Sequence, residues 1–355
     1  MILVFPAFLL YTLIQAISGI SVSPGATIRH AALFAGCAAV LLAARRAVLL
    51  LRRRAWLAAL PLLIVGVAQA AIGIRQHSFG DDEIHVRGTF HNRNHFAGFL
   101  EMALPLAAGW VVVFARRVDP RAGGGVRAAL GAGACAAAAL VIVLGIVYSL
   151  SRAAFGAAVV GMVALGTGLL PRRVRLPGAV VLAATVVLGL AWLAPALLFD
   201  RFGRLAGETQ RVWLWRETVE MIRERPLVGW GFGAYGTALV ARRGPLPDFP
   251  DVYAHNDYLQ LAAELGVVGL LLLGAATLPA ARDVLRAAAG DRDRNRTVLA
   301  LACLAGMAAL ATHSLVDFQL YVPANLLSFA WLAGTACGVS ASLPETASAA
   351  STASR

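Results

Sequence analysis

Residues 128–149 read AALGAGACAAAALVIVLGIVYS, an uncharged apolar run long enough to cross a membrane as one helix. A spanning helix needs about 20 such residues. Similar runs recur along the chain, which has 355 residues, 59% of them hydrophobic and 14% charged. A soluble domain is roughly half apolar and a quarter charged. The sequence therefore predicts an all-α, polytopic transmembrane helical bundle.

The apolar runs predict about ten membrane-spanning helices. We expect them at residues 1–20, 29–44, 55–74, 95–115, 128–149, 153–170, 176–197, 258–280, 297–314 and 322–340. The second and ninth are short, so they either tilt little or extend into their flanks. The first has no basic segment before it and no cleavage site after it, which predicts a retained helix. Residues 341–355 are rich in Ala, Ser and Thr, and we expect a disordered tail.

Arginine clusters predict the orientation of this bundle. Every basic side chain is arginine, the net charge is +12, and the clusters follow the second, fourth, sixth and eighth predicted spans. Their members are Arg45, Arg46, Arg52, Arg53, Arg54, Arg116, Arg117, Arg121, Arg127, Arg172, Arg173, Arg175, Arg282, Arg286, Arg292, Arg294 and Arg296. Cytoplasmic loops carry such an excess. We therefore expect cytoplasmic termini, and no nucleic-acid partner, because the charges form no continuous basic face.

The largest polar segment on the opposite side is the loop 198–257. Within it, residues 209–225 predict an amphipathic helix that lies on the membrane surface as a lid. Its expected apolar stripe is Val212, Trp215, Val219 and Ile222. On the other face Glu220 can pair with Arg216 or Arg223.

Histidines are confined to one side in this topology. The predicted cytoplasmic loops contain none, whereas the opposite side carries His85, His91, His95, His255 and His313 among Asn, Gln, Tyr and acidic residues. The orientation of the protein in the membrane accounts for the arginine clusters, but it does not account for these histidines and the polar residues around them. We therefore expect the chemistry on the non-cytoplasmic side. The cysteines Cys37, Cys135, Cys303 and Cys337 lie inside apolar runs and predict buried small hydrophobic residues.

Five polar segments carry a resemblance to a known family. They are HNRNHFAGFLEMALPL (91–106), SRAAFGA (151–157), RVWLWRETVEMIRERPLVGWGFGAY (211–235), HNDYLQLAAELGVVGL (255–270) and HSLVDFQLYVPAN (313–325). Together, and in this order, they resemble the O-antigen ligase and polymerase-like membrane proteins. The resemblance implies a GT-C-like fold, with N-terminal transmembrane helices at 1–87, a ligase-like membrane domain at 88–340 with 198–257 as its periplasmic loop, and a cytoplasmic tail at 341–355.

The same resemblance implies an activity. Such proteins transfer a glycan from an undecaprenyl-diphosphate carrier to an acceptor hydroxyl, at the periplasmic face of the bacterial inner membrane. The residues fit both a ligase and a polymerase, which differ in the acceptor: a lipid, a protein-linked sugar or a growing glycan. An inverting reaction without metal or cofactor is implied.

Arginines suit a diphosphate leaving group, because guanidinium groups form forked, charge-assisted hydrogen bonds with phosphate. Arg152 lies in a short polar turn between two apolar spans, where a charge is costly. The alternative is an arginine that snorkels to the membrane interface. Arg211 resembles the family's second diphosphate-binding arginine, and Arg216 follows it. For both, the alternative is a solvated helix face.

His255 is the candidate general base that takes the proton of the acceptor hydroxyl. The alternative is that Asn256 or Asp257 caps the eighth span and His255 is incidental.

Other polar residues are candidates for contact with sugar hydroxyls. Asp257, Gln260 and Glu264 share one helix face, where they either orient the site or bind substrate, with Asn256 beside them. Asn92, Asn94 and His95 either position substrate or form interhelical hydrogen bonds. His313 and Asp317, four residues apart, are expected to pair.

The sequence leaves three further interpretations open: a metal site, a transporter and a non-catalytic partner. Asp81, Asp82 and Glu83 could hold a metal, but we expect a solvated loop. A solute or inorganic-carbon transporter would place polar residues near the membrane midplane and often shows inverted repeats. Here the polar residues lie at the rim and no repeat is found, although Glu101 and Glu264 keep that alternative open. A non-catalytic partner of a polysaccharide export machine is a third possibility.

Overall fold

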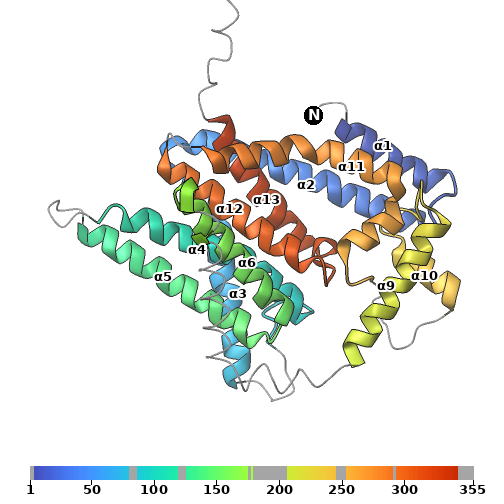
Figure 1. Ribbon diagram of the computed structural model, residues 1–355, viewed down its shortest axis with the longest axis horizontal. Coiled ribbons are helices and arrows are strands. Elements are labelled where there is room, and N and C mark those ends of the chain that lie inside the picture. Colours follow the sequence, from blue (N-terminus) through green and yellow to red (C-terminus); the bar gives the residue numbers. More distant parts are fainter. Residues whose placement is uncertain are drawn as a thin grey trace, which may run out of the picture.

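The structure is a computed structural model that describes residues 4–79, 86–118, 125–174, 177–178, 206–244, 253–290 and 293–342. These residues form helices and short connections, without a strand among them (Figure 1). The helices are α1 (Val4–Ile17), α2 (Pro24–Leu51), α3 (Leu60–Phe79), α4 (Arg93–Ala115), α5 (Gly125–Tyr148), α6 (Arg152–Leu169), α9 (Ala206–Glu224), α10 (Tyr235–Arg243), α11 (Asp257–Ala289), α12 (Arg294–His313) and α13 (Pro323–Ala341). Short 3-10 segments are η1 (Arg52–Ala59), η2 (Arg172–Val174) and η3 (Gln319–Tyr321).

The protein is an all-α, multi-pass membrane bundle, as the apolar runs predict. In the described residues, seven helical stretches are long and apolar enough to cross a membrane, counting Pro24–Ser78 as one; α1 is a shorter apolar helix. Nine predicted spans coincide with helices. The span at 176–197 apart from 177–178, and the tail predicted at 341–355 apart from 341–342, lie outside the described residues, and Ala341 still belongs to α13. The second span, predicted at 29–44, extends into its flanks and forms the 28 residues of α2.

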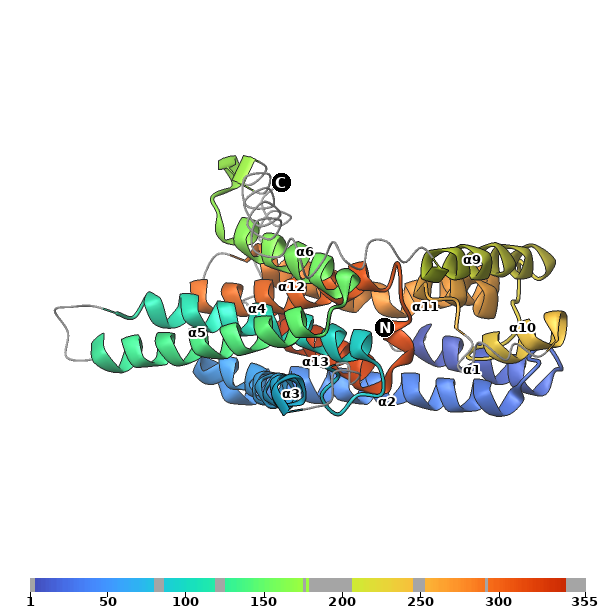
Figure 2. The ribbon, with the colours of Figure 1, turned by 90° about the horizontal axis from the view of Figure 1, so that it is seen from below.

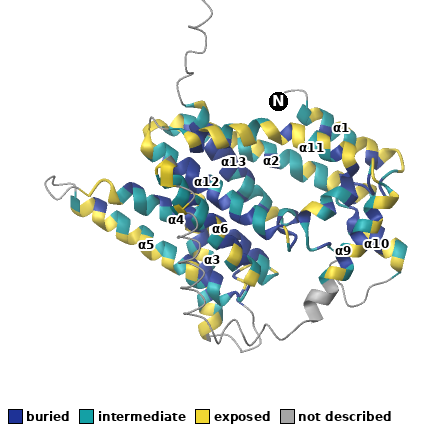
Figure 3. Ribbon diagram, in the orientation of Figure 1, coloured by how far each residue is buried: buried dark blue, intermediate teal, exposed yellow. Residues whose placement is uncertain are grey.

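The helices α4, α12 and α13 form the centre of the bundle. The most apolar window of α4 is 78% buried and those of α12 and α13 are each 61% buried, against 17% for α5 (Figure 3). Helix α12 approaches α4 and α6 closely, because a glycine of one helix faces the backbone of the other. Gly306 of α12 lies against Met102 of α4, and Gly161 of α6 lies against Ala305 of α12. Small residues let membrane helices pack tightly.

The register of these contacts sets which helix ends meet. Gly168 of α6 lies against Leu301, and Gly161 lies against Ala305 and Ala309, so α6 and α12 are antiparallel. The α4–α12 pair is antiparallel too, because Glu101 in the first turns of α4 contacts His313 at the end of α12. The starts of α4 and α6 and the end of α12 therefore lie at one end of the bundle (Figure 1, Figure 2).

A helix is present where the amphipathic lid was predicted: α9 agrees with the expected bounds of 209–225 to within three residues, but its buried face is different. Leu214, Glu217, Thr218 and Met221 are buried, whereas Val212 of the predicted stripe is 44% exposed. The buried face packs on α10 and α11 and tolerates Glu217 because Arg243 of α10 pairs with that carboxylate at 2.6 Å. The choice of face thus follows from the hairpin with α10, which amphipathicity alone does not reveal. Glu220 pairs with Arg223, also at 2.6 Å.

Helix α11 is interrupted at Gly266, where φ is +60° and ψ is −176°. The segment after α9 fills the interruption. Trp230 N and Gly231 N donate to the carbonyls of Ala263 and Glu264, and Val267 N and Val268 N donate to those of Pro226 and Leu227. Backbone groups freed at a break inside a membrane need such partners. The segment that follows α9 is therefore held to α11 by backbone hydrogen bonds as well as by side chains.

Candidate functional site

His255 occupies the turn that enters α11. Its φ of +48° lies in the left-handed region, which residues with a Cβ seldom adopt. The next residue, Asn256, is the N-cap: its Oδ1 accepts from Tyr258 N and Leu259 N, both at 3.0 Å. His255 Nδ1 lies 3.0 Å from Asp317 Oδ1, and the His255 side chain is 26% exposed. The carboxylate fixes one imidazole nitrogen, which leaves the other for a reacting group.

Asp317 is a fully buried carboxylate that several donors surround. Besides His255, Phe318 N donates to Oδ1 at 2.9 Å, and Asn94 Nδ2 donates to Oδ2 at 2.7 Å. Burial opposes ionisation, but the hydrogen bond and charge of His255 and the charges of His313 and His95 outweigh it. The pKa of Asp317 therefore lies well below its usual range. A permanently ionised carboxylate can orient an imidazole and stabilise its protonated form.

Aromatic rings pack around this pair. The Phe318 ring lies edge to face with the rings of His255 and His95, at centroid distances of 4.9 and 4.5 Å. Tyr253 stacks on Phe318 at 4.0 Å. Both imidazoles are therefore held by the same ring. His95 is buried, and its Nε2 has no hydrogen-bond partner among the described residues.

Beneath the pair lies a second buried polar cluster. His313 Nδ1 is 3.1 Å from Glu101 Oε2, so His313 pairs with Glu101 rather than with Asp317 as predicted. The prediction was wrong because residues 314–318 leave the helix, and Asp317 turns towards α11 instead of continuing along α12. Gln319 Nε2 donates to the carbonyl of Asn94 at 3.2 Å, and its Oε1 accepts from Asn325 Nδ2 at 2.7 Å. These contacts fasten the start of α4 to η3 and α13.

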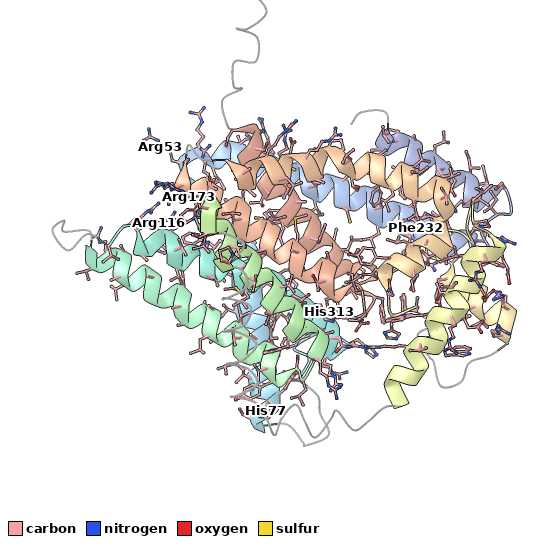
Figure 4. The ribbon with its side chains drawn as sticks, in the orientation of Figure 1. Arg53, His77, Arg116, Arg173, Phe232 and His313 are labelled. Atoms are coloured by element: carbon pink, nitrogen blue, oxygen red, sulfur yellow. The ribbon has the colours of Figure 1, made fainter. Side chains whose placement is uncertain are left out.

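The three candidate arginines are placed differently. Arg211 is half-buried on α9, and its charge interacts with His313. The register of α6 on α12 brings the Arg152 end of α6 to the His313 end of α12 (Figure 4). Arg216 is exposed, and none of the ion pairs among the described residues includes it. Arg211 and Arg152 thus belong to the same end of the bundle as His255.

Most of the other candidates already bond within the protein. Asn92 caps α4, accepting from Asn94 N at 2.7 Å. Asp257 is fully buried and accepts from Leu320 N at 2.8 Å. Gln260 and Glu264 are also buried and bond to each other at 3.2 Å. The structure therefore brings these residues together as a framework around His255.

Sequence reasoning missed Asp317 as the partner of His255, and did not single out Phe318 and Gln319. The usable signal was the segment 313–325, whose polar residues are too dense for a plain helix connection. The acidic run Asp81–Glu83 lies outside the described residues. Within the described residues, no group of His, Cys, Asp and Glu has the arrangement of a metal site.

The fold and site together define a multi-pass helical membrane protein with a histidine–carboxylate pair at one end of its bundle. Residues 136–274 match the model of the O-antigen ligase family. The chain is also 28% identical over 256 residues to the exopolysaccharide production protein ExoQ of Rhizobium meliloti (strain 1021), an alignment that covers 68% of this chain and 56% of that protein. The chain thus matches about half the length of that curated relative. Both matches support an O-antigen ligase-like family for this chain, which confirms the resemblance of the motifs.

Proposed function

We propose that the protein is a membrane glycosyltransferase that makes cell-surface polysaccharide, such as O-antigen or exopolysaccharide. Its donor would be a glycan on undecaprenyl diphosphate, and its acceptor a hydroxyl of a glycan, lipid or protein-linked sugar. The observation that carries the proposal is the His255–Asp317 pair, 3.0 Å apart, at the helix ends that Arg211 and Arg152 also reach. The family match and the similarity to an exopolysaccharide production protein support the same class of substrate.

In this reaction the acceptor hydroxyl attacks the anomeric carbon of the donor sugar. The new carbon–oxygen bond forms as the bond to the diphosphate oxygen breaks, and its electron pair leaves with the diphosphate. His255 takes the hydroxyl proton through Nε2, while Asp317 holds Nδ1 and stabilises the imidazolium. Arg211 and Arg152 bind the diphosphate and stabilise the charge that grows on it. Attack opposite the leaving group inverts the anomeric carbon, and these steps use no metal.

The proposed site faces the periplasm, with both termini in the cytoplasm of a bacterial inner membrane. The arginines support this orientation, because Arg53, Arg116 and Arg173 lie at the end of the bundle away from His313 (Figure 4). Cytoplasmic loops carry such clusters.

A transporter would use the interruption of α11 as a binding site, because broken membrane helices expose free backbone groups. Here the interruption is filled by Pro226–Gly231, whose backbone pairs with residues 263–268. Glu264 is likewise saturated by donors of the chain. These contacts favour the enzyme over the transporter.

The test is release of lipid diphosphate from a lipid-linked oligosaccharide by the purified protein. We expect His255→Ala to lower turnover by about 10²–10⁴-fold, the usual contribution of a general base. The matched control is His77→Ala, since His77 is an exposed histidine of α3 that stacks on Tyr148 at 4.2 Å, outside the site. Equal turnover by wild type and His255→Ala would remove His255 from the mechanism.

A further inference from the structure

Glu264 is a buried carboxylate whose two oxygens accept hydrogen bonds from four donors of the chain. Its Oε2 accepts from Gly233 N at 2.7 Å and from Tyr321 OH at 2.6 Å. Its Oε1 accepts from Tyr235 N and Gln260 Nε2, both at 3.2 Å. The residue is fully buried in α11, next to the interruption at Gly266. A charge buried inside a membrane protein is expensive, so such residues usually have a function.

One set of these bonds leads to the lid. Tyr235 N is fixed by Glu264, and Tyr235 OH lies 2.8 Å from Thr218 Oγ1 on the buried face of α9. Thr218 is two turns from Arg211 on the same helix. Because an α-helix is stiff, fixing Thr218 also fixes the direction in which the Arg211 end of α9 points.

The other set leads to the candidate base. Gln260 Nε2 donates to Glu264, and Gln260 Oε1 accepts from Ala254 N at 3.0 Å. Ala254 directly precedes His255, whose positive φ must be held by its surroundings. The acceptor on Ala254 N is therefore part of what keeps His255 in this strained turn.

Resting on the proposed function, we infer that Glu264 is a positioning residue that holds the Arg211-bearing lid and the His255 turn in one geometry. Two sets of hydrogen bonds connect Glu264 to the site, and we call them its two arms. One runs through Tyr235 to Thr218, towards the diphosphate site, and the other runs through Gln260 to Ala254, towards the base. Glu264 touches no substrate. The sugar-binding alternative for Glu264 is disfavoured, because both of its oxygens are already occupied by donors of the chain.

The two arms can be broken separately. Thr218→Val removes the hydroxyl contact with Tyr235, together with a local bond to the carbonyl of Leu214 within α9. We expect a rise of about tenfold in the KM for lipid-linked oligosaccharide and little change in kcat. Gln260→Met removes the acceptor for Ala254 N together with the donor to Glu264 Oε1, so we expect a fall of about tenfold in kcat with the donor KM unchanged. Glu264→Gln must present an NH₂ group to two donors and should show both effects. Glu220→Gln, an exposed carboxylate on the same lid, is the matched control and should show neither.

Hydrogen exchange gives a readout that does not depend on activity. In substrate-free protein in nanodiscs, Glu264→Gln should speed exchange of the Gly233–Tyr235 and Ala254 amides by about tenfold, whereas peptides from α12 should not change. If these amides exchange faster in Glu264→Gln than in wild type, but wild type releases no lipid diphosphate, the proposed function fails while the positioning role of Glu264 is retained. If Glu264→Gln exchanges like wild type, or if all variants lose kcat with an unchanged donor KM, the positioning role is overturned. Should Glu264→Gln fail to fold, the split between Thr218→Val and Gln260→Met decides.

Discussion

His255 is strained in its backbone and held at one nitrogen, and both features follow from its neighbours. Asn256 begins α11 as its N-cap, so the residue before it must turn sharply into the helix. Asp317 then takes Nδ1. Left-handed conformations of residues with a Cβ cost energy and collect at functional sites. The strain is thus an argument for function that the sequence motif alone does not supply.

Asp317→Asn tests the orienting carboxylate. The amide keeps the shape of the side chain but carries no charge and can present an NH₂ group to His255, so the imidazole loses its fixed orientation. We expect kcat to fall by about 10–100-fold, part of the usual contribution of a general base. Turnover of lipid-linked oligosaccharide measures this effect. Asp293→Asn, which alters the N-cap at the other end of α12, should stay within about twofold of wild type. A fully active Asp317→Asn would mean that the pair does not serve catalysis.

Arg211 and Arg216 form a natural matched pair, one helical turn apart on α9. Arg211 is half-buried and lies within electrostatic range of His313, whereas Arg216 is exposed. We expect Arg211→Gln to raise the donor KM by at least about tenfold, because charge-assisted bonds to phosphate are strong. Arg216→Gln should change it by less than about twofold. Equal effects of the two substitutions would indicate that the lid contributes general positive charge instead of a defined contact.

The residues of the site could be predicted only in part. His255 and Arg211 stand in motifs within a loop that is predicted on the non-cytoplasmic side, so the sequence singles them out as candidates. Asp317 is 62 residues from His255 in the chain, and nothing local shows that the link after α12 folds back onto α11. Spacing instead suggested a pair with His313, because four residues make neighbours only where a helix continues. Long-range side-chain pairing is the part that a single sequence does not encode locally.

At the level of elements, the length and polarity of each apolar run predicted well which segments form helices. They predicted less well which face of a helix is buried. The described spans coincide with apolar runs because a membrane accepts backbone only when its hydrogen bonds are internally satisfied. The buried face of α9 was predicted from apolar spacing and was wrong, since an ion pair with α10 allows Glu217 inside. The interruption of α11 was not predicted, because a glycine among apolar residues also fits an unbroken membrane helix.

Gly266→Ala tests that interruption. A Cβ at Gly266 would lie 2.5 Å from the backbone of Leu227, and its φ of +60° with an extended ψ is a region that only glycine adopts readily. We expect a loss of at least about 1–3 kcal/mol of stability and detachment of the lid. Thermal unfolding in detergent measures the first effect. Gly274→Ala is the control on the same helix, because a Cβ there meets nothing within 4 Å. Similar midpoints for both variants would argue that α11 can run straight.

Across the whole molecule, the arginine clusters of the connections and the candidate site lie at opposite ends. The arginines Arg53, Arg116 and Arg173 come from three separate connections, and all three lie at one end of the bundle, away from His313 (Figure 4). The antiparallel register of α4, α6 and α12 produces this separation, because each polar connection alternates sides with each span. The separation agrees with the proposed use of a lipid-borne donor on one face of the membrane.

Cysteine accessibility tests the orientation. The native cysteines are buried or half-buried within spans, so they should give little background with a membrane-impermeant maleimide. In intact spheroplasts we expect Thr89→Cys and Arg223→Cys, both at exposed positions near the site end, to be labelled. Arg53→Cys and Arg116→Cys, exposed at the arginine-rich end, should be labelled only after permeabilisation, because cytoplasmic loops retain the arginines. The reverse pattern would put His255 in the cytoplasm, away from any periplasmic acceptor, and would contradict the proposed function while leaving the fold unchanged.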